Sequence, residues 1–153
     1  MRLACPEDFY GLIYSHYRHH EGYAKRANLF RYFPDPILVV GCGFGFLVTE
    51  LLKLDKDAWG IDASPYAVEN RENDRVELGN ILDGKLKAGK FATVVTEDLL
   101  PYLTDDEAIA ASRNCQGIVV HMVTEQGQAD LNYHSTGYWM NLTKQLTVSL
   151  EGM

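Results

Sequence analysis

Three alternating glycines carry the clearest chemical signal in this chain. Gly41, Gly43 and Gly45 follow the apolar run at residues 37–40 and precede a helix-like pattern. Glycine tolerates a positive φ and lets a ligand approach the bare backbone, and a helix start presents free N–H groups at a positive dipole end. The spacing therefore predicts a strand, a tight turn and a helix start that together bind a polar cofactor.

The residue after the third glycine separates this turn from dinucleotide-binding loops. The dinucleotide fingerprint G-x-G-x-x-G requires a glycine at the position that Phe46 occupies here. Nicotinamide and flavin cofactors are therefore disfavoured.

An acid at the end of the next expected strand, residues 58–62, completes the signal. Asp62 follows Gly41 by about 20 residues, the spacing at which a carboxylate in a strand–helix–strand unit accepts hydrogen bonds from both ribose hydroxyls. The alternative is a solvated turn residue, but the upstream glycines favour the ribose role. Ser64 and Pro65 then predict a helix start, as N-cap and first helical residue.

The order of these motifs resembles that of the class I (Rossmann-like) S-adenosylmethionine-dependent methyltransferases. The matching segments are VVGCGFG, GIDASPYAV, LGNILD, FATVVTEDLLPYL and NCQGIVVHMV, which span about residues 23–124. The resemblance implies S-adenosyl-L-methionine as the cofactor and methyl transfer as the reaction. It implies a glycine loop against the amino-acid part of the cofactor, an acid at the ribose, a segment at the adenine edge and a segment at the methionine end. In that order, the implied residues are Gly41, Cys42, Gly43 and Gly45; Asp62 and Ala63; Asn80 and Ile81; and Thr96 and Glu97.

Three positions depart from the family pattern. Val39 and Ala92 stand where many members carry acids, and Asn80 replaces the usual acid at the adenine position. An asparagine still donates and accepts hydrogen bonds, so adenine recognition is retained. Val39 removes a group that orders the glycine loop, which predicts weaker cofactor binding than usual.

The catalytic base stays open. The cofactor methyl is already activated, so positioning dominates the rate, and a base helps only if the acceptor carries a proton. Candidates are His19, His20, His121 and Glu97. Tandem histidines on a helix are more often surface residues, and a strand histidine is more often hydrogen-bonded within the core.

The composition indicates one domain. The chain has 153 residues, 46% hydrophobic and 23% charged, which suits a single core. A formal net charge of −7 gives no general attraction to nucleic acid, which is disfavoured as a partner. The basic residues near the N-terminus are interpreted as a solvated helix face. They are Arg18, Lys25, Arg26 and Arg31.

Cysteines and apolar runs indicate a cytoplasmic location without metal. Cys5, Cys42 and Cys115 have neither metal-ligand spacing nor a disulfide framework. No apolar run approaches the roughly 18 residues that cross a bilayer, so no membrane partner is expected. Cys42 is assigned to packing, because a turn between glycines needs a small side chain.

Helical and apolar segments alternate along the chain. Helices are expected over 6–33, from about 46, over 65–72, over 104–114 (opened by a capping box) and over 137–144; strands are expected at 37–40, 58–62, 76–78, 91–95, 118–123 and 146–150. This order predicts an α/β three-layer sandwich with a mostly parallel sheet, and a ligand at the carboxyl ends of the strands.

The expected domain, 1–153, has three parts. These are an N-terminal helical lid segment (1–33), a cofactor-binding core (37–123) and a short C-terminal helix and strand (124–153). The last part is too short for the further helix, sixth strand and antiparallel seventh strand of the family, so we expect a short form without the seventh strand. An unpaired sheet edge needs cover, which predicts a homodimer or a partner protein there.

Three functions remain open from the sequence. The first is methyl transfer to a small molecule or to an exposed group on a protein partner. The second is a non-catalytic S-adenosylmethionine-binding sensor or partner subunit of a methyltransferase. The third is an enzyme that cleaves the cofactor without an acceptor.

Overall fold

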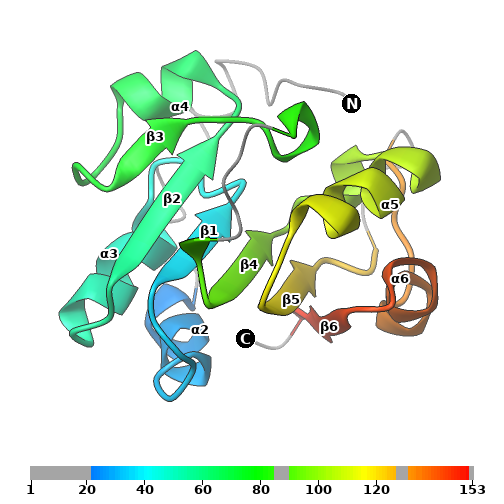
Figure 1. Ribbon diagram of the computed structural model, residues 1–153, viewed down its shortest axis with the longest axis horizontal. Helices are drawn as coiled ribbons and strands as arrows, with labels where there is room; N and C mark the ends of the chain where they lie inside the picture. The colour runs from blue at the N-terminus through cyan, green and yellow to red at the C-terminus, as the bar shows by residue number, and fades with distance from the viewer. Residues whose placement is uncertain (1–21, 85–89, 127–130, 152–153) are drawn as a thin grey trace.

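The computed structural model describes residues 22–84, 90–126 and 131–151. Over this part of the chain, six strands form one sheet in the order β3-β2-β1-β4-β5-β6. Every neighbouring pair of strands is parallel. Helices lie on both faces of the sheet (Figure 1). The predicted three-layer α/β sandwich with a Rossmann-like sheet is confirmed.

The elements alternate along the chain as expected. The strands are β1 (Ile37–Val40), β2 (Ala58–Asp62), β3 (Val76–Leu78), β4 (Thr93–Glu97), β5 (Ile118–Val123) and β6 (Leu146–Ser149). The α-helices are α2 (Tyr23–Leu29), α3 (Phe46–Lys53), α4 (Pro65–Glu69), α5 (Asp105–Asn114) and α6 (Thr136–Thr143). Two 3-10 helices, η2 (Ile81–Asp83) and η4 (Leu100–Tyr102), lie in the connections.

The sheet separates two hydrophobic cores. From β1 the chain steps outward to β2 and β3, and from β4 it steps the other way to β5 and β6, so right-handed crossovers place the two sets of helices on opposite faces. Val39 and Val95 face the core shared with α2 and α3, whereas Val40 and Val94 face the core shared with α5 and α6. Burial on both faces explains why β1 and β4 are continuous apolar runs.

Most expected element ends are confirmed, and a few are wrong. The Ser64 hydroxyl caps α4 by accepting the Ala67 N–H at 3.3 Å, and the capping box that opens α5 is present. Strand β4 runs from Thr93 to Glu97 rather than over 91–95. The Ala92 N–H donates to Pro36 O, ahead of the ladder that begins where Ile37 pairs with Thr93. Helix α4 ends at Glu69 rather than at residue 72.

The expected helical segment over 6–33 lies mostly outside the described residues. Its described part is α2, which ends at Leu29 rather than at residue 33 and whose buried residues include Tyr23, Arg26 and Ala27. Lys25 and Arg31 are exposed, as predicted for a solvated face. Arg26 corrects that prediction, because it is only 5% exposed and points into the protein.

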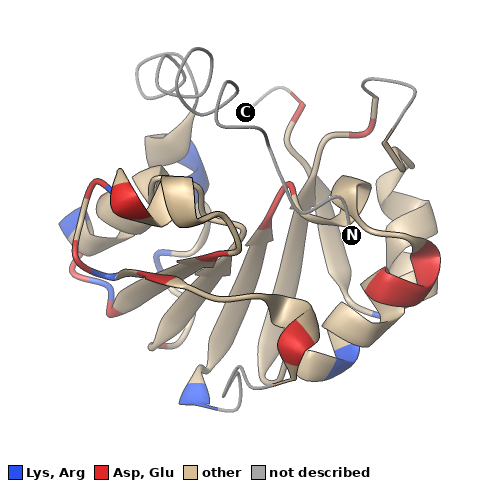
Figure 2. Cartoon of the chain, turned by 90° about the horizontal axis from the view of Figure 1, so that it is seen from above, with Lys and Arg blue, Asp and Glu red and all other residues tan. Residues whose placement is uncertain are grey.

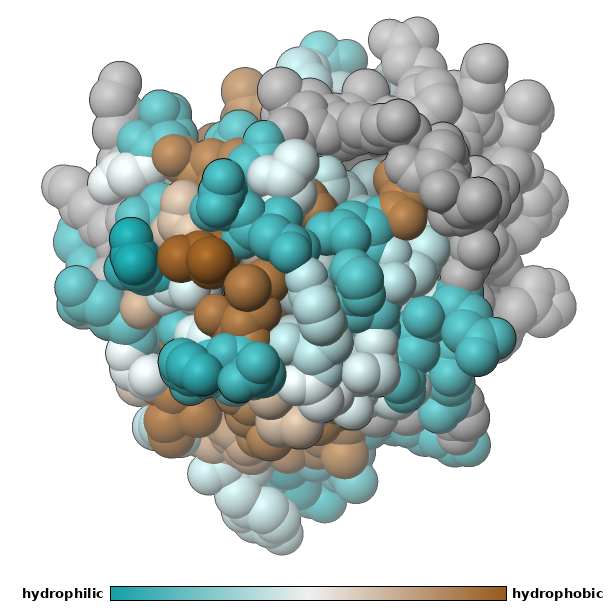
Figure 3. Space-filling model, turned by 90° about the vertical axis from the view of Figure 1, so that its right-hand side faces the viewer, coloured by the Kyte–Doolittle hydropathy of each residue, from teal (hydrophilic) through white to brown (hydrophobic). Residues whose placement is uncertain are grey.

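Strand β6 pairs directly with β5 at one edge of the sheet. Its four residues run parallel to β5, with Val120 opposite Leu146, and no seventh strand occurs within the described residues. Figure 3 shows this side of the molecule, where hydrophobic side chains interrupt the hydrophilic surface. Ile118 and Leu146 are among the exposed apolar residues, at 46% and 50%. A homodimer or partner protein at this edge stays a prediction.

None of the described helices is both long and apolar enough to cross a bilayer.

Candidate cofactor-binding site

The glycine loop joins β1 to α3 at the carboxyl end of the sheet. Gly41, Gly43 and Gly45 have φ values of 72°, 56° and 87°, in the left-handed region that favours glycine. The Gly41 and Cys42 N–H groups donate to Ile61 O at 2.9 and 3.1 Å, which fastens the loop to β2. Gly45 is the N-cap of α3. The predicted strand–turn–helix unit is therefore present.

Gly45 is required by space as well as by φ. A Cβ at this position lies 2.5 Å from Val76 Cγ2 and 3.2 Å from Asn73 Nδ2. Real Cβ atoms do not approach carbon so closely, so a larger residue displaces either the loop or β3. The glycine thus sets how closely the loop packs on β3.

Asp62 connects the loop to the start of α4. Its side chain is 6% exposed; Oδ2 accepts the Gly43 N–H at 2.8 Å and Oδ1 accepts the Ser64 N–H at 2.9 Å. The sequence predicted a ribose ligand here but not this contact with the loop. Asp62 supplies a carboxylate that orders the loop, the function whose loss was expected from Val39, which is a fully buried core residue.

The Cys42 thiol lies beneath the loop and serves packing. A Cβ at Gly60 is 2.7 Å from Cys42 Sγ, so the thiol occupies the space that this glycine leaves open. Burial raises the pKa of the thiol well above its ordinary value, and the negative charges of Asp62 and Glu97 raise it further. The thiol therefore stays protonated, and both carboxylates lie close enough to influence it.

Glu97 ends β4 and faces α2. It is 8% exposed, and its Oε1 lies 3.8 Å from Nη1 of Arg26, which is equally buried. The Arg26 guanidinium lies 4.9 Å from the centre of the Tyr23 ring, and Tyr23 packs edge-to-face on Phe46 at 5.4 Å. Helix α2 thus connects the first residue of α3 with the end of β4.

The sequence analysis did not predict that Arg26 is buried beside Glu97. Its position was nevertheless readable, because Tyr23, Arg26, Ala27 and Phe30 recur at the i, i+3, i+4, i+7 spacing of a buried helix face. A charged residue inside such an apolar stripe indicates a buried charge partner.

Thr96 and His121 lie on the opposite face of the sheet from Glu97. Both are fully buried, and Thr96 Oγ1 lies 2.7 Å from His121 Nδ1. His121 Nε2 lies 2.7 Å from Gln145 Oε1, while Gln145 Nε2 donates to Ser112 O at 2.9 Å. Because a carbonyl can only accept, the Gln145 oxygen must face His121. The ring therefore carries its proton on Nε2 and accepts the Thr96 hydroxyl on Nδ1.

This geometry matches the alternative in which His121 is a strand histidine hydrogen-bonded within the core. Burial lowers the pKa of His121, and the hydrogen bond that its Nε2–H donates to Gln145 Oε1 opposes that shift only in part. The ring is neutral, with both nitrogens hydrogen-bonded inside the protein. The Thr96 hydroxyl is likewise directed at His121. The other histidine candidates, His19 and His20, lie outside the described residues.

The segment expected at the adenine edge lies beside Asp62. The Gly79 N–H donates to Asp62 O at 3.0 Å, which places Asn80 next to the end of β2. Asn80 Oδ1 accepts the Leu82 N–H at 3.0 Å and caps η2, and Ile81 is 2% exposed. Ala63 is half-buried between Asp62 and the Ser64 cap.

Asp98 was not predicted. It follows β4 with a φ of 50°, and its carboxylate accepts the Thr124 N–H at 2.8 Å and the Thr124 hydroxyl at 3.1 Å. The side chain joins the carboxyl ends of β4 and β5. Its sequence signal is an acid directly after a strand, which does not distinguish this role from a solvated turn.

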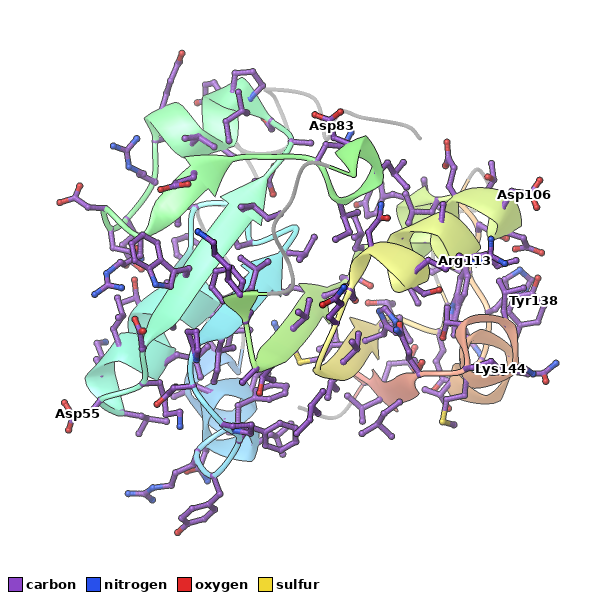
Figure 4. All side chains as sticks on the ribbon, viewed as in Figure 1. Asp55, Asp83, Asp106, Arg113, Tyr138 and Lys144 are labelled. Carbon is purple, nitrogen blue, oxygen red and sulfur yellow. The ribbon has the colours of Figure 1, made fainter. Side chains whose placement is uncertain are left out.

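A separate polar cluster joins α5 to α6. The Tyr138 hydroxyl donates to Asp105, and Asn132 Nδ2 donates to Asp105 Oδ1 at 3.1 Å. Asn132 also contacts His134, which stacks on the Tyr138 ring. Tyr138 belongs to α6 and lies at the outer margin of the molecule (Figure 4). The cluster stabilises the helices and is separate from the glycine loop.

Charges of both signs are spread over the described residues. Figure 2 shows acidic and basic segments interspersed, without a continuous basic face among the coloured residues. The described residues contain no group of three or more side chains placed to hold a metal ion.

The fold and the glycine loop define a Rossmann-like methyltransferase domain. The sequence matches the family described as "Methyltransferase domain" over residues 38–119, more than half of the chain. The chain belongs to this family, and the resemblance to class I methyltransferases is confirmed. No curated protein matches the sequence closely enough to count as a relative.

Solved structures support the fold. The PH0226 protein of Pyrococcus horikoshii is 12% identical with a TM-score of 0.68, over 92% of this chain and 86% of that one. A TehB-like SAM-dependent methyltransferase of Corynebacterium glutamicum is 18% identical with a TM-score of 0.67, over 90% and 80%. DesVI of Streptomyces venezuelae is 26% identical with a TM-score of 0.57, over 73% and 54%. The chain thus spans about half the length of DesVI and of other proteins whose solved structures it matches.

Proposed function

We propose that this chain binds S-adenosyl-L-methionine and transfers its methyl group to a small molecule or to an exposed group on a protein partner. One observation carries the proposal: the buried Asp62 carboxylate at the end of β2 is joined to a loop of three glycines with positive φ. The glycines bring bare backbone to the ligand, and the acid lies at the position that suits a ribose.

Asp62 has the chemistry and the placement of a ribose ligand. Oδ2 accepts the Gly43 N–H and Oδ1 accepts the Ser64 N–H, so the carboxylate lies between the glycine loop and the start of α4. A carboxylate at this end of β2 can accept hydrogen bonds from ribose hydroxyls. The backbone contacts also fix the orientation of the carboxylate before a ligand arrives, which lowers the entropy cost of binding.

The neighbouring segments suit the other parts of this cofactor. Asn80 uses its side-chain oxygen to cap η2, which leaves its amide N–H groups for the acceptor nitrogens of adenine. Glu97 places a buried negative charge near the loop, at the end proposed for the amino-acid part. The bound cofactor supplies an activated methyl group. The protein then holds the acceptor in line and excludes water.

A non-catalytic sensor or partner subunit is the second candidate. The observation in its favour is that the described base candidates are both engaged: His121 is neutral and hydrogen-bonded at both nitrogens, and Glu97 lies beside Arg26. Methyl transfer to an acceptor that carries no ionisable proton needs no base, so this observation does not favour the sensor for every acceptor.

Two measurements test the proposal. Titration calorimetry with S-adenosylmethionine and S-adenosylhomocysteine is expected to show binding of both, and no binding of either contradicts the whole assignment. Incubation with methyl-labelled cofactor and a cell lysate then separates the functions. Label in an acceptor supports methyl transfer, breakdown of the cofactor without a labelled acceptor supports cleavage, and tight binding without either supports a sensor.

A further inference from the structure

Strand β6 ends the sheet on the side of β5, and no further strand lies beside it within the described residues. We propose that a second copy of this chain pairs with this edge. The two β6 strands then lie antiparallel across a twofold axis at Val148, and the two sheets become one. This proposal is independent of the proposed function, because it uses no residue of the cofactor site.

The backbone of β6 directs hydrogen-bonding groups away from the sheet. Alternate residues of a parallel strand bond to the same neighbour, and the Leu150 N–H donates to Val123 O of β5 at 2.8 Å. The N–H and C=O groups of Thr147 and Ser149 therefore face outward, and within the described residues they have no other backbone partner. Thr147 is only 4% exposed, so water compensates its backbone groups poorly. A strand added at this edge supplies the missing hydrogen bonds.

The side chains along this edge have nearly the same order in both directions. Leu146, Val148 and Leu150 are apolar, and they alternate with the hydroxyl residues Thr147 and Ser149. An axis at Val148 places each leucine opposite the other leucine, and each threonine opposite a serine. The same register pairs the outward backbone groups of Thr147 with those of Ser149. A twofold dimer requires such a self-complementary surface, which is why we choose a second copy as the partner.

Exposed apolar side chains extend the edge onto one face of the sheet. Leu146 is 50% exposed, and Ile118 is 46% exposed on the same face of β5. Val148 and Leu150 are partly buried against the core shared with α2 and α3. Figure 3 shows hydrophobic side chains along the lower margin of the side on which α6 and β6 lie. A second copy removes apolar surface of this kind from water.

The charges at the two ends of β6 favour an antiparallel pair. Edge strands commonly carry a charge or a proline that prevents pairing, and β6 has neither between Lys144 and Glu151. Both of these residues are exposed. In the antiparallel pair, Lys144 of one copy and Glu151 of the other lie at the same end, whereas a parallel pair brings like charges together. Charge complementarity therefore selects the antiparallel arrangement.

Sedimentation velocity over a range of protein concentrations tests for the dimer, which we expect of the unaltered protein. Leu146→Lys should raise the dissociation constant of the dimer about 100-fold or more, because pairing would bury an ammonium opposite Leu150 of the second copy. The matched control is Leu78→Lys. Leu78 is 60% exposed on β3, the opposite edge strand, so this variant carries the same change and should remain dimeric.

Thermal unfolding shows whether each variant is folded. If Leu146→Lys is unfolded, Ser149→Pro replaces it. A proline there removes an outward N–H that the ladder with β5 does not use, and it should also yield a folded monomer.

Single cysteines test the register. Val148→Cys should form a disulfide-linked dimer under mild oxidation, because the axis places the two residues opposite each other at a Cα separation that a disulfide spans. Leu150→Cys lies on the same face but two residues from the axis, so it should form no link. The unaltered protein controls for the native thiols of Cys5, Cys42 and Cys115.

Three results overturn the proposal. A monomeric mass at every concentration means that this edge binds no second copy and is left to another protein or to solvent. A dimer that Leu146→Lys leaves intact forms elsewhere on the molecule. A dimer that Val148→Cys does not link has its axis at another residue. None of these results affects the proposed function, which the binding of S-adenosylmethionine tests separately.

Discussion

Asp62 at the end of β2 and His121 in β5 are both buried polar side chains, and their partners differ in kind. Asp62 accepts backbone N–H groups from the glycine loop and from the start of α4, the two segments that border the proposed cofactor site. His121 lies between Thr96 and Gln145, and both ring nitrogens are hydrogen-bonded. Asp62, in the first half of the sheet, therefore orders the proposed cofactor site. His121, in the second half, contributes to the stability of the fold.

The connections between strands and helices differ between the two halves of the sheet in the same way. Between β1 and α3 the chain uses glycines with positive φ, which keep side chains away from the site. Between β5 and β6 it uses Asn132, His134 and Tyr138, and the hydrogen bonds of Asn132 and Tyr138 to Asp105 fasten α6 to α5. Substitutions in the first half should alter binding as well as stability, and those in the second half should alter stability alone.

The largest expected effect is that of Gly45→Ala. A Cβ there lies 2.5 Å from Val76 Cγ2 at a φ of 87°, so strain and overpacking together should lower the free energy of unfolding by about 2–5 kcal/mol. Denaturant unfolding measures this loss. Gly84→Ala is the control, because Gly84 has a φ of 61° but no atom within 4 Å of its added Cβ. Equal losses in the two variants would show that packing against Val76 does not matter.

The next effect is that of His121→Leu. The change leaves the Thr96 hydroxyl and the Gln145 oxygen without their partner in a buried place, which should cost about 2–4 kcal/mol of stability. Calorimetry should show S-adenosylhomocysteine binding with near-normal affinity once the protein is folded. A large loss of affinity in a folded His121→Leu protein would contradict the division of roles between the two halves.

Asp62→Ala should alter cofactor binding, in contrast to His121→Leu. Removing the carboxylate should weaken cofactor binding by about 1–3 kcal/mol, the range for a charge-assisted hydrogen-bonding partner. Part of the loss is expected from a less ordered loop, because the Gly43 N–H loses its acceptor. Calorimetry with S-adenosylhomocysteine measures the change, and an unchanged affinity refutes the ribose assignment.

The pH dependence of the free energy of unfolding reports on the protonation of His121. Burial lowers its pKa in the folded protein below the ordinary value of 6.5, so the unfolded chain binds this proton more readily. The stability contribution is complete above pH 6.5 and falls as the pH drops below it, by at most about 1.4 kcal/mol per pH unit. The variant His121→Gln does not titrate there. The stability difference between the two proteins should therefore shrink from pH 7.5 to 5.5, and parallel curves would contradict a neutral buried ring.

The smallest effect concerns Tyr138→Phe. The Tyr138 hydrogen bond is the main cause that lowers the pKa of Asp105 from its ordinary value of 3.8, and the Asn132 hydrogen bond adds to it. The variant should raise the pKa of Asp105 toward 3.8, as followed by NMR titration. Thr104→Ala, which alters the neighbouring cap, should leave that pKa in place.

Local patterns predicted the first half of the sheet in some detail. The glycine spacing, the acid about 20 residues later and the Ser64–Pro65 helix start each depend on neighbours in the sequence, and each occurs where expected. The expected capping box at Thr104 and Glu107 is local in the same sense. Such features are readable because a few adjacent residues determine the backbone conformation.

Contacts between distant residues were not predictable in the same way. Arg26 and Glu97 belong to different layers, and Gln145 meets His121 only because β6 lies directly beside β5. Successive side chains of a strand point to opposite faces of the sheet, so the neighbouring residues Thr96 and Glu97 face different cores. The sequence placed both residues at the methionine end, and the structure turns the Thr96 hydroxyl toward His121.

The rate at which a reagent alkylates the Cys42 thiol can measure how often the glycine loop opens. Sγ lies beneath the loop against Gly60, and burial together with two carboxylates keeps it in the unreactive protonated form. An alkylating reagent can therefore modify it only when the loop lifts. Cys115, whose pKa burial raises to about 12, provides an internal reference in the other core. The ratio of the two labelling rates thus reports how often the loop opens relative to the rest of the domain.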